Sequence, residues 1–143
     1  MATVAEILGE KSGAVIEIDG DATVFDAVKA MVAANVGAIL VTTGGEIEGI
    51  FTERDYLRRI VVEGRRSRDT SVREVMSAPV ICFTPDTSVD EGMALMSDRR
   101  IRHAPVVDDG AVVGMISIGD LVKFTSKLQS FQIQYLNEYI TAR

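Results

Sequence analysis

One seven-residue stretch occurs twice in the chain, as Gly49-Ile50-Phe51-Thr52-Glu53-Arg54-Asp55 and as Gly114-Met115-Ile116-Ser117-Ile118-Gly119-Asp120. Each copy has a glycine, two apolar residues, a hydroxyl residue and, three positions after the hydroxyl residue, an aspartate. A hydroxyl residue followed by an acid at the third helical position is typical of a capping box. We therefore expect each copy to end a strand and begin a helix. The same pair of side chains could also hold a polyol next to a phosphate.

The sequence around these stretches repeats in one register. The interval from Gly49 to Gly114 equals the interval from Asp55 to Asp120. Further pairs at this same spacing are Val15-Ile16 and Val80-Ile81, Asp21 and Asp86, Val24 and Val89, Met31 and Met96, Val41 and Val106, and Gly45 and Gly110. A register kept through two helices and a hairpin indicates an internal duplication. The opening segments differ, because Thr3 and Ser71 are farther apart than the other pairs and the first copy has extra residues around 10–13.

Each copy is predicted to fold as strand, helix, hairpin and helix. Apolar residues at helical spacing predict the helices, and short apolar runs next to glycine turns predict the strands. In the first copy we expect a strand at 15–18, a helix from Thr23 to about Ala34, strands at 38–42 and 47–52, and a helix from Thr52 to about Val62 with Tyr56, Leu57, Ile60 and Val61 inward. Capping boxes at Thr3-Val4-Ala5-Glu6 and Ser71-Val72-Arg73-Glu74 predict a short opening helix for each copy.

These elements predict an α+β fold with two modules. The boundaries are 1–62 for the first module with its short N-terminal helix, 63–70 for a solvated basic linker, and 71–126 for the second module. Residues 127–143 are predicted to form an amphipathic C-terminal helix, because Phe131, Tyr135 and Tyr139 fall on one stripe. This stripe could pack within the chain or form a surface for self-association.

Composition favours a soluble globular protein: 47% of the 143 residues are hydrophobic and 25% are charged. No apolar run approaches the ~20 residues that cross a bilayer, and Met1 to Gly9 has no signal-peptide pattern. We therefore expect a cytoplasmic protein without a membrane partner. The net charge of −6 argues against nucleic-acid binding. The single cysteine, Cys82, excludes an internal disulfide and a multi-cysteine metal site, and we expect it in the core on a buried strand.

The duplicated unit resembles a tandem pair of CBS domains (cystathionine-β-synthase-type modules). The resemblance rests on the pattern G-h-h-[ST]-x-x-D, where h is apolar, and on residues 102–110, which read Arg-His-Ala-Pro-Val-Val-Asp-Asp-Gly. The resemblance covers roughly residues 3–126, and the chain is similar to stand-alone two-module proteins. It implies that the modules pack sheet to sheet about a pseudo-two-fold axis. It also implies two clefts for adenosine-containing ligands, such as AMP, ADP, ATP, NAD(H) or S-adenosylmethionine, and association into a homodimer.

The same resemblance implies the residues of each cleft. Asp55 or Asp120 would accept ribose hydroxyls, and arginines would face phosphates. The N–H groups at the start of the helix after Thr52 are expected to be free for an anion. The first cleft would use Ile50, Thr52, Arg54, Asp55, Pro79, Ile81, Ile101, Arg102 and His103. The second would use Met115, Ser117 and Asp120 with Lys11, Ala14, Ile16, Val36, Gly37 and Ala38.

The two implied clefts differ in charge. Gly119 stands where the first copy has Arg54, and Gly37 and Ala38 stand where the second copy has Arg102 and His103. Lys11 is the cation nearest to the second cleft in this interpretation. We therefore expect the Asp55 cleft to prefer phosphorylated nucleotides and the Asp120 cleft to bind more weakly or to take another adenosyl compound.

Three functions remain open from the sequence. The favoured one is a regulatory module that senses an adenine nucleotide and passes the signal to a separate effector protein by a change of shape or association. A constitutive protein-interaction scaffold, in which the hydroxyl–aspartate pairs are only helix caps, is the first alternative. A nucleotide hydrolase is the second, although we find no nucleophile–base pair, metal cluster or Gly-Lys phosphate loop. We expect no enzymatic activity.

Overall fold

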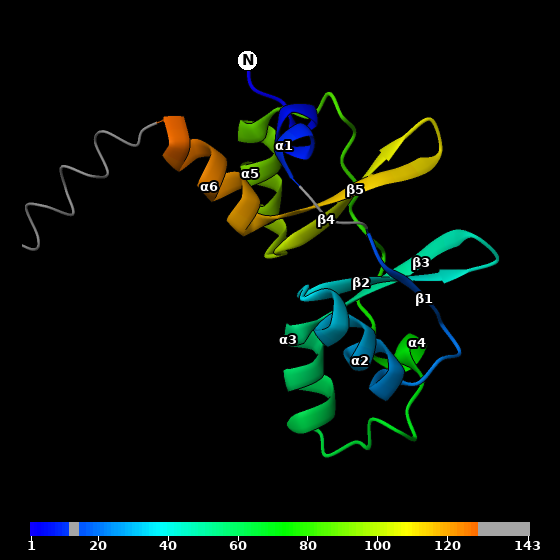
Figure 1. The fold of residues 1–143 in the computed structure, drawn as a ribbon. Helices are drawn as coiled ribbons and strands as arrows, with labels where there is room; N and C mark the ends of the chain where they lie inside the picture. Colours follow the sequence, from blue (N-terminus) through cyan, green and yellow to red (C-terminus); the bar gives the residue numbers. More distant parts are fainter. Residues whose placement is uncertain (12–14, 129–143) are drawn as a thin grey trace, which may run out of the picture. The chain divides into compact units, whose positions relative to one another are not determined.

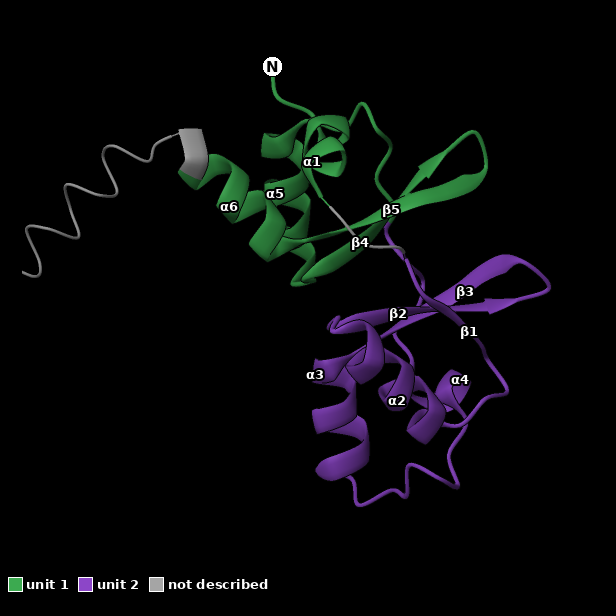
Figure 2. Ribbon diagram, in the orientation of Figure 1, with its two compact units in different colours: residues 1–12, 82–143 green, residues 13–81 purple. Residues whose placement is uncertain are grey.

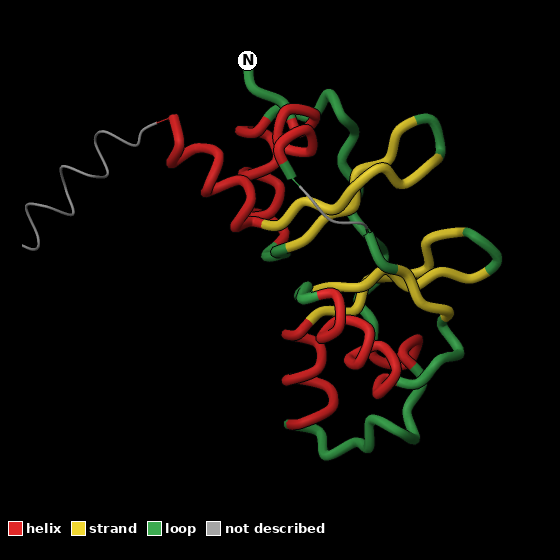
Figure 3. The backbone as a smooth tube through the Cα atoms, in the orientation of Figure 1, coloured by secondary structure: helices red, strands yellow, loops and turns green. Residues whose placement is uncertain are grey.

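A computed structural model of the chain describes residues 1–11 and 15–128 (Figure 1). These residues form two compact units, coloured separately in Figure 2. Unit 1 contains residues 1–12 and the chain from residue 82 onward, and unit 2 contains residues 13–81. Figure 3 shows that helices and strands occur in both units, so the predicted α+β class is confirmed.

Unit 2 has a three-stranded sheet of β1 (Glu17–Asp19), β2 (Ala38–Thr43) and β3 (Glu46–Thr52), in that order. β1 pairs parallel with β2, and β2 pairs antiparallel with β3. The helical elements are α2 (Val24–Ala34), α3 (Glu53–Asp55), the π-helix η1 (Tyr56–Val61) and α4 (Val72–Val75). The buried core joins the sheet to these helices and consists of Val24, Ala27, Met31, Ile39, Val41, Phe51, Ile60, Val72 and Val75.

Unit 1 has a two-stranded antiparallel sheet of β4 (His103–Asp108) and β5 (Ala111–Ser117). Its helices are α1 (Val4–Glu10), α5 (Val89–Arg99) and α6 (Ile118–Leu128). The buried apolar residues of this unit include Val4, Ile7, Phe83, Met96, Ile116 and Leu121. The C-terminal helix predicted for residues 127–143 lies outside the described residues, except for its first two residues, which belong to α6.

Each unit contains the opening helix that the sequence repeat assigns to the other copy. In unit 2, α4 packs on β3, and a Cβ built on Gly49 would lie 2.4 Å from Met76 Sδ. In unit 1, α1 packs on β5, and a Cβ on Gly114 would lie 2.4 Å from Leu8 Cδ2. The glycine that begins each repeated stretch is therefore the position at which the hairpin is crossed by an apolar side chain, from Leu8 within α1 or from Met76 directly after α4.

The glycine turns and helix caps of the first copy follow their sequence signals. Gly44 and Gly45 have φ of 60° and 83°, the left-handed conformation that a tight hairpin turn requires. The side chain of Thr23 accepts a hydrogen bond from the Asp26 N–H at 3.1 Å and caps α2. α2 ends at Ala34, and the residue that follows it, Asn35, has φ of 55°.

The cap predicted for α1 does not form. The side chain of Thr3 makes no cap hydrogen bond. Instead, the N–H groups of Val4 and Ala5 donate to the carbonyl oxygens of Thr87 and Pro85, at 2.8 and 3.1 Å. Tertiary backbone bonds thus satisfy the first N–H groups of α1, which a side-chain cap otherwise serves.

The helix that follows Thr52 is not a regular α-helix. After α3, residues 56–61 wind as a π-helix, with i→i+5 hydrogen bonds, so the helical spacing used for the prediction does not apply. Ile60 is buried and Tyr56 packs against the core, as predicted. Leu57 and Val61 are 57% and 55% exposed, so their predicted inward orientation is wrong.

The strand predicted near Val80-Ile81 is reduced to one bridge, between Phe83 and Val106. In the first copy, the outer bonds of the β1–β2 ladder are donated by the N–H groups of Leu40 and Gly20. The corresponding residues are Pro105 and Pro85, which have no N–H group. Phe83 keeps two ladder bonds to β4, each 2.8 Å long.

Cys82 is exposed and lies outside the strands, so its predicted place in the core is wrong. It precedes Phe83, whose side chain is buried with 2% exposure.

The linker at 63–70 is held against unit 2. The Phe25 N–H donates to the Ser67 carbonyl oxygen, and the Arg68 guanidinium lies 3.8 Å from the centre of the Phe25 ring. Arg65 pairs with Glu74 of α4 at 3.1 Å. Most of the linker is exposed, as predicted, but Arg65 and Arg68 also contact α4 and α2.

Arg73 fixes α4 to the hairpin of unit 2. Its Nε donates to Glu48 Oε1 at 2.6 Å, its Nη2 donates to Thr43 Oγ1 at 2.9 Å, and it also bonds Asp21. The hydrogen bond from Arg73 is the main cause that holds the pKa of Glu48 below its usual value, and the hydrogen bond from Thr43 adds to it. One arginine thus ties the opening helix to β2, to β3 and to the turn after β1.

Candidate functional site

The predicted Thr52–Asp55 pair forms a reciprocal capping box in unit 2. Thr52 Oγ1 accepts from the Asp55 N–H at 3.2 Å, and Asp55 Oδ2 accepts from the Thr52 N–H at 3.1 Å. The Thr52 hydroxyl also lies 3.2 Å from Asp55 Oδ2. Asp55 is 7% exposed. A carboxylate has about four lone-pair sites, so these bonds leave acceptor capacity for a ligand.

Ser77, which the sequence reasoning missed, is the second residue that bonds Asp55. Its hydroxyl donates to Asp55 Oδ1 at 2.8 Å. Its N–H donates to the Ile50 carbonyl oxygen at 2.8 Å, and its carbonyl oxygen accepts from the Ile50 N–H at 3.0 Å. The one sequence signal for Ser77 is its place two residues before the predicted Pro79.

The backbone N–H groups at the start of α3 are largely in use. The Glu53 N–H donates to the Gly37 carbonyl oxygen at 3.1 Å, and the Asp55 N–H donates to Thr52. The prediction that such groups are free for a phosphate is therefore wrong for these two. Phosphate charge on this side would have to be met by side chains, and Arg54 is exposed beside the pair.

Not every arginine of this region is available for a ligand. Nη1 of Arg59 donates to the carbonyl oxygens of Val75 and Met76, at 3.2 and 2.9 Å. Arg59 therefore closes the end of α4, where carbonyl groups have no partner within the helix.

The second pair, Ser117 and Asp120, repeats this geometry in unit 1. The Ser117 N–H donates to Asp120 Oδ2 at 2.8 Å, and Ser117 Oγ accepts from the Asp120 N–H at 3.0 Å. The Ile118 N–H donates to the Arg102 carbonyl oxygen, as Glu53 does to Gly37. The repeated stretch thus folds in the same way twice.

In unit 1, Lys11 binds the carboxylate of Asp120 through its ammonium group. Its Nζ donates to Asp120 Oδ2 at 2.7 Å and to the Met115 carbonyl oxygen at 2.6 Å. Burial alone would raise the pKa of Asp120, but the bonds from Lys11 and from the Ser117 backbone outweigh it and the pKa is lowered. Because the folded-state pKa is the lower one, this stabilisation is present at neutral pH and is lost as the pH falls through the lowered pKa.

Each predicted residue set is divided between the units. Within unit 2 the structure brings together Thr52, Asp55 and Ile50, with Ile50 buried at 8% exposure. Within unit 1 it brings together Lys11, Met115, Ser117 and Asp120. The remaining residues of the first set are Arg54, Pro79 and Ile81 in unit 2 and Ile101, Arg102 and His103 in unit 1. The remaining residues of the second set are Ile16, Val36, Gly37 and Ala38 in unit 2, while Ala14 lies outside the described residues.

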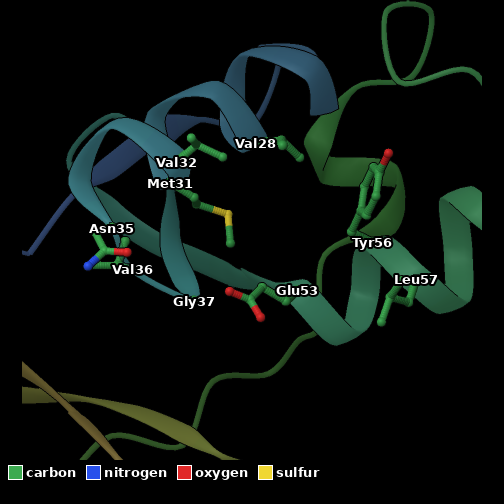
Figure 4. A pocket seen from close by; sticks show the side chains of 9 residues that line it. All are labelled: Val28, Met31, Val32, Asn35, Val36, Gly37, Glu53, Tyr56 and Leu57. Atoms are coloured by element: carbon green, nitrogen blue, oxygen red, sulfur yellow. The ribbon is translucent and has the colours of Figure 1, made fainter.

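A separate apolar pocket lies on the helical side of unit 2 (Figure 4). Its volume is about 480 Å³. Side chains of α2 and of η1 line it, and the lining residues are Val28, Met31, Val32, Asn35, Val36, Gly37, Glu53, Tyr56 and Leu57. Val32 and Leu57 are 74% and 57% exposed. Val36 and Gly37, predicted for the Asp120 cleft, thus line this pocket.

Within residues 1–11 and 15–128, no group of three or more His, Cys, Asp or Glu side chains could hold a metal ion. Over the same residues, no helix is long and apolar enough to cross a membrane.

Comparison with known proteins gives a consistent result. The sequence model of the CBS domain matches residues 4–62 and 72–127. The chain is similar to the CBS domain-containing protein CBSX3, mitochondrial, of Arabidopsis thaliana, with 43% identity over 96% of this chain and 71% of that protein.

Solved structures agree with this match. A putative signal-transduction protein with CBS domains from Burkholderia ambifaria has a TM-score of 0.83 and 46% identity, over 87% of this chain and 93% of that one. A hexameric CBS-CP12 protein from bloom-forming cyanobacteria has a TM-score of 0.79 and 26% identity, over 99% of this chain and 86% of that one.

Proposed function

This chain belongs to the CBS-domain family, whose members are generally regulatory and ligand-binding, and we propose that it senses adenosine-containing nucleotides. The ligand would be AMP, ADP, ATP or NAD(H). Binding would change the shape or the association of the protein, and an effector protein would respond to that change. No enzyme family is indicated by the comparisons.

The observation that carries the proposal is the repeated hydroxyl–carboxylate pair. Thr52 with Asp55 and Ser117 with Asp120 have the same backbone and side-chain bonds in two different units. An ionised carboxylate accepts hydrogen bonds only, and a vicinal diol such as that of ribose offers two donors to it. Arg54, exposed one residue before Asp55, has a permanent positive charge for a phosphate of the ligand.

Replacing Asp55 tests the proposal most directly. In Asp55→Ala the ligand loses a hydrogen bond to a charged acceptor, which is worth about 1.5–3 kcal/mol, so AMP affinity should fall by about 10- to 100-fold. Isothermal titration calorimetry measures this loss. The matched control is Asp26→Ala, since Asp26 is the acid at the same helical position after the cap Thr23. Asp26→Ala should bind AMP as the wild type does.

The outcome separates the proposal from the scaffold alternative. A scaffold would lose stability in Asp55→Ala, because the cap is lost, but no adenosine compound would raise the melting temperature of the wild type. A true ligand at about 100 times its Kd should stabilise the fold by about 2.7 kcal/mol. A thermal-shift panel of AMP, ADP, ATP, NAD, NADH and S-adenosylmethionine decides between these outcomes.

A second copy of the chain is the proposed occupant of the apolar pocket of unit 2. Of the lining residues only Glu53 is charged, and two of the apolar ones, Val32 and Leu57, are 74% and 57% exposed. Exposed apolar groups that gather on one face favour association over solvation. A relative described as hexameric supports assembly in this family.

Charge placed in the pocket should break this dimer. Val32→Glu puts a carboxylate among apolar lining residues and should weaken dimerisation at least tenfold, by about 1.4 kcal/mol or more. Sedimentation equilibrium measures the change. Lys29→Glu, on α2 but outside the pocket lining, is the control and should remain dimeric. A monomeric wild type, or a Val32→Glu protein that dimerises normally, would contradict this prediction.

A further inference from the structure

The two hydroxyl–carboxylate pairs differ in the side-chain group that donates a hydrogen bond to the aspartate from outside the pair. In unit 2 it is the neutral hydroxyl of Ser77, 2.8 Å from Asp55 Oδ1. In unit 1 it is the ammonium group of Lys11, 2.7 Å from Asp120 Oδ2. Both groups come from the segment that follows an opening helix, since α4 ends at Val75 and α1 ends at Glu10.

The correspondence extends to the backbone. The Ile50 carbonyl oxygen accepts from the Ser77 N–H at 2.8 Å, and the carbonyl oxygen of Met115, the repeat counterpart of Ile50, accepts from Lys11 Nζ at 2.6 Å. In unit 1, Lys11 therefore bonds a carbonyl oxygen and a carboxylate whose counterparts in unit 2 both bond Ser77. Its side chain is 34% exposed and that of Asp120 is 24% exposed, so the pair is partly shielded from water.

The chemical consequence is that the two carboxylates are not equally open to a diol. A serine hydroxyl both donates and accepts, so it can turn and accept a bond from an incoming ribose hydroxyl. An ammonium group only donates, and its bond to a carboxylate is charge-assisted. A ribose diol that binds both carboxylate oxygens of Asp120 must compete with a full positive charge for Oδ2.

We propose that Lys11 makes the binding of ribose at the two aspartates unequal, because its ammonium group is bound to the Asp120 carboxylate and keeps the ribose of an adenosine-containing ligand away from it. This rests on the proposed function, in which the hydroxyl–carboxylate pairs bind ribose. Asp55 then takes the nucleotide first, and Asp120 binds only when Lys11 leaves. The inequality thus arises from a cation that belongs to the chain itself.

Lys11→Met tests this role, since methionine keeps an unbranched apolar stem and removes the charge. In an Asp55→Ala background, where binding at Asp120 is measured alone, Lys11→Met should tighten the binding of AMP and of adenosine. An ion pair of this exposure is worth up to about 1 kcal/mol, so the gain should be about fivefold. Lys11→Arg should retain the wild-type weakness, and Lys29→Met, which removes an exposed lysine of unit 2, should change nothing. Calorimetry measures all four proteins.

The opposite result is equally clear. If Lys11 contacts the phosphate of the ligand instead, Lys11→Met weakens AMP binding and leaves adenosine binding unchanged. Either that pattern or unchanged binding of both probes overturns the proposal.

A ligand-free measurement separates this inference from the proposed function. The 13C carboxyl signal of Asp120, titrated in the wild type and in Lys11→Gln, should show a higher pKa in the variant. Failure of every adenosine compound to bind would end the proposed function. An unchanged carboxyl pKa would show that Lys11 does not occupy Asp120 and would end this inference alone.

Discussion

Phe83→Ala should destabilise unit 1 by about 3–5 kcal/mol, the cost of emptying a large buried aromatic site. Phe83 is 2% exposed. Its ring lies near Gly92 of α5, where a Cβ would meet it at 3.4 Å. It is also the one residue of its segment that bridges to β4, with bonds to Pro105 and Val107. Urea unfolding followed by far-ultraviolet circular dichroism measures the loss.

The matched control is Ile18→Ala in unit 2. Ile18 is the repeat counterpart of Phe83, but it lies within a paired strand and is only partly buried. Ile18→Ala should lower the free energy of unfolding clearly less than Phe83→Ala does, because less apolar area is removed from the core and the strand keeps its hydrogen bonds. If the two substitutions cost the same, the single bridge of Phe83 does not have the role that we give it.

Gly49→Ala should be the second most damaging of the changes considered, at about 1–3 kcal/mol from overpacking. A Cβ at this position would lie 2.4 Å from Met76 Sδ and 2.9 Å from the Ser77 carbonyl oxygen. Met76 can change its rotamer, but the Ser77 carbonyl is fixed by its bond to the Ile50 N–H. The backbone of Ser77 must therefore move, and its hydroxyl bond to Asp55 should lengthen.

Gly49→Ala should consequently lower AMP affinity as well as stability. Gly114→Ala is the informative comparison, because the nearest atoms to the added Cβ all belong to the side chain of Leu8. Leu8 can shift, so that substitution should cost less. Gly9→Ala, where nothing lies within 4 Å, is the neutral control. Equal effects of Gly49→Ala and Gly114→Ala would contradict the importance of the Ser77 backbone.

Much of the fold was predictable because its signals are local. The hairpin turn needs positive φ at Gly44 and Gly45, and the caps at Thr23 and Thr52 need side chains three residues from their partners. The internal repeat keeps a constant spacing between corresponding residues, so the elements of one copy predict those of the other. The α+β class and the two hydroxyl–aspartate pairs followed from these patterns, and the resemblance to a known family gave the family.

The predictions that failed depended on bonds that no local pattern contains. The β-strand before Phe83 shortens because Pro85 and Pro105, far apart in the sequence, both lack an N–H for the same ladder. The N–H groups at the start of α3 are not free as predicted, because Gly37 takes one of them. Ser77 was missed because its contact with Asp55 spans 22 residues.

The sequence by itself determined the duplication, most of the elements and the identity of the two carboxylates, since capping and turn formation act over a few residues. The tertiary structure decided which neighbour each carboxylate has. Asp55 receives a neutral hydroxyl from Ser77, and Asp120 receives an ammonium group from Lys11, which is 109 residues away in the chain. The physical reason is that each opening helix packs on the hairpin at a glycine. This packing places the segment that follows the helix, with Ser77 or Lys11, next to the aspartate of that hairpin's repeated stretch.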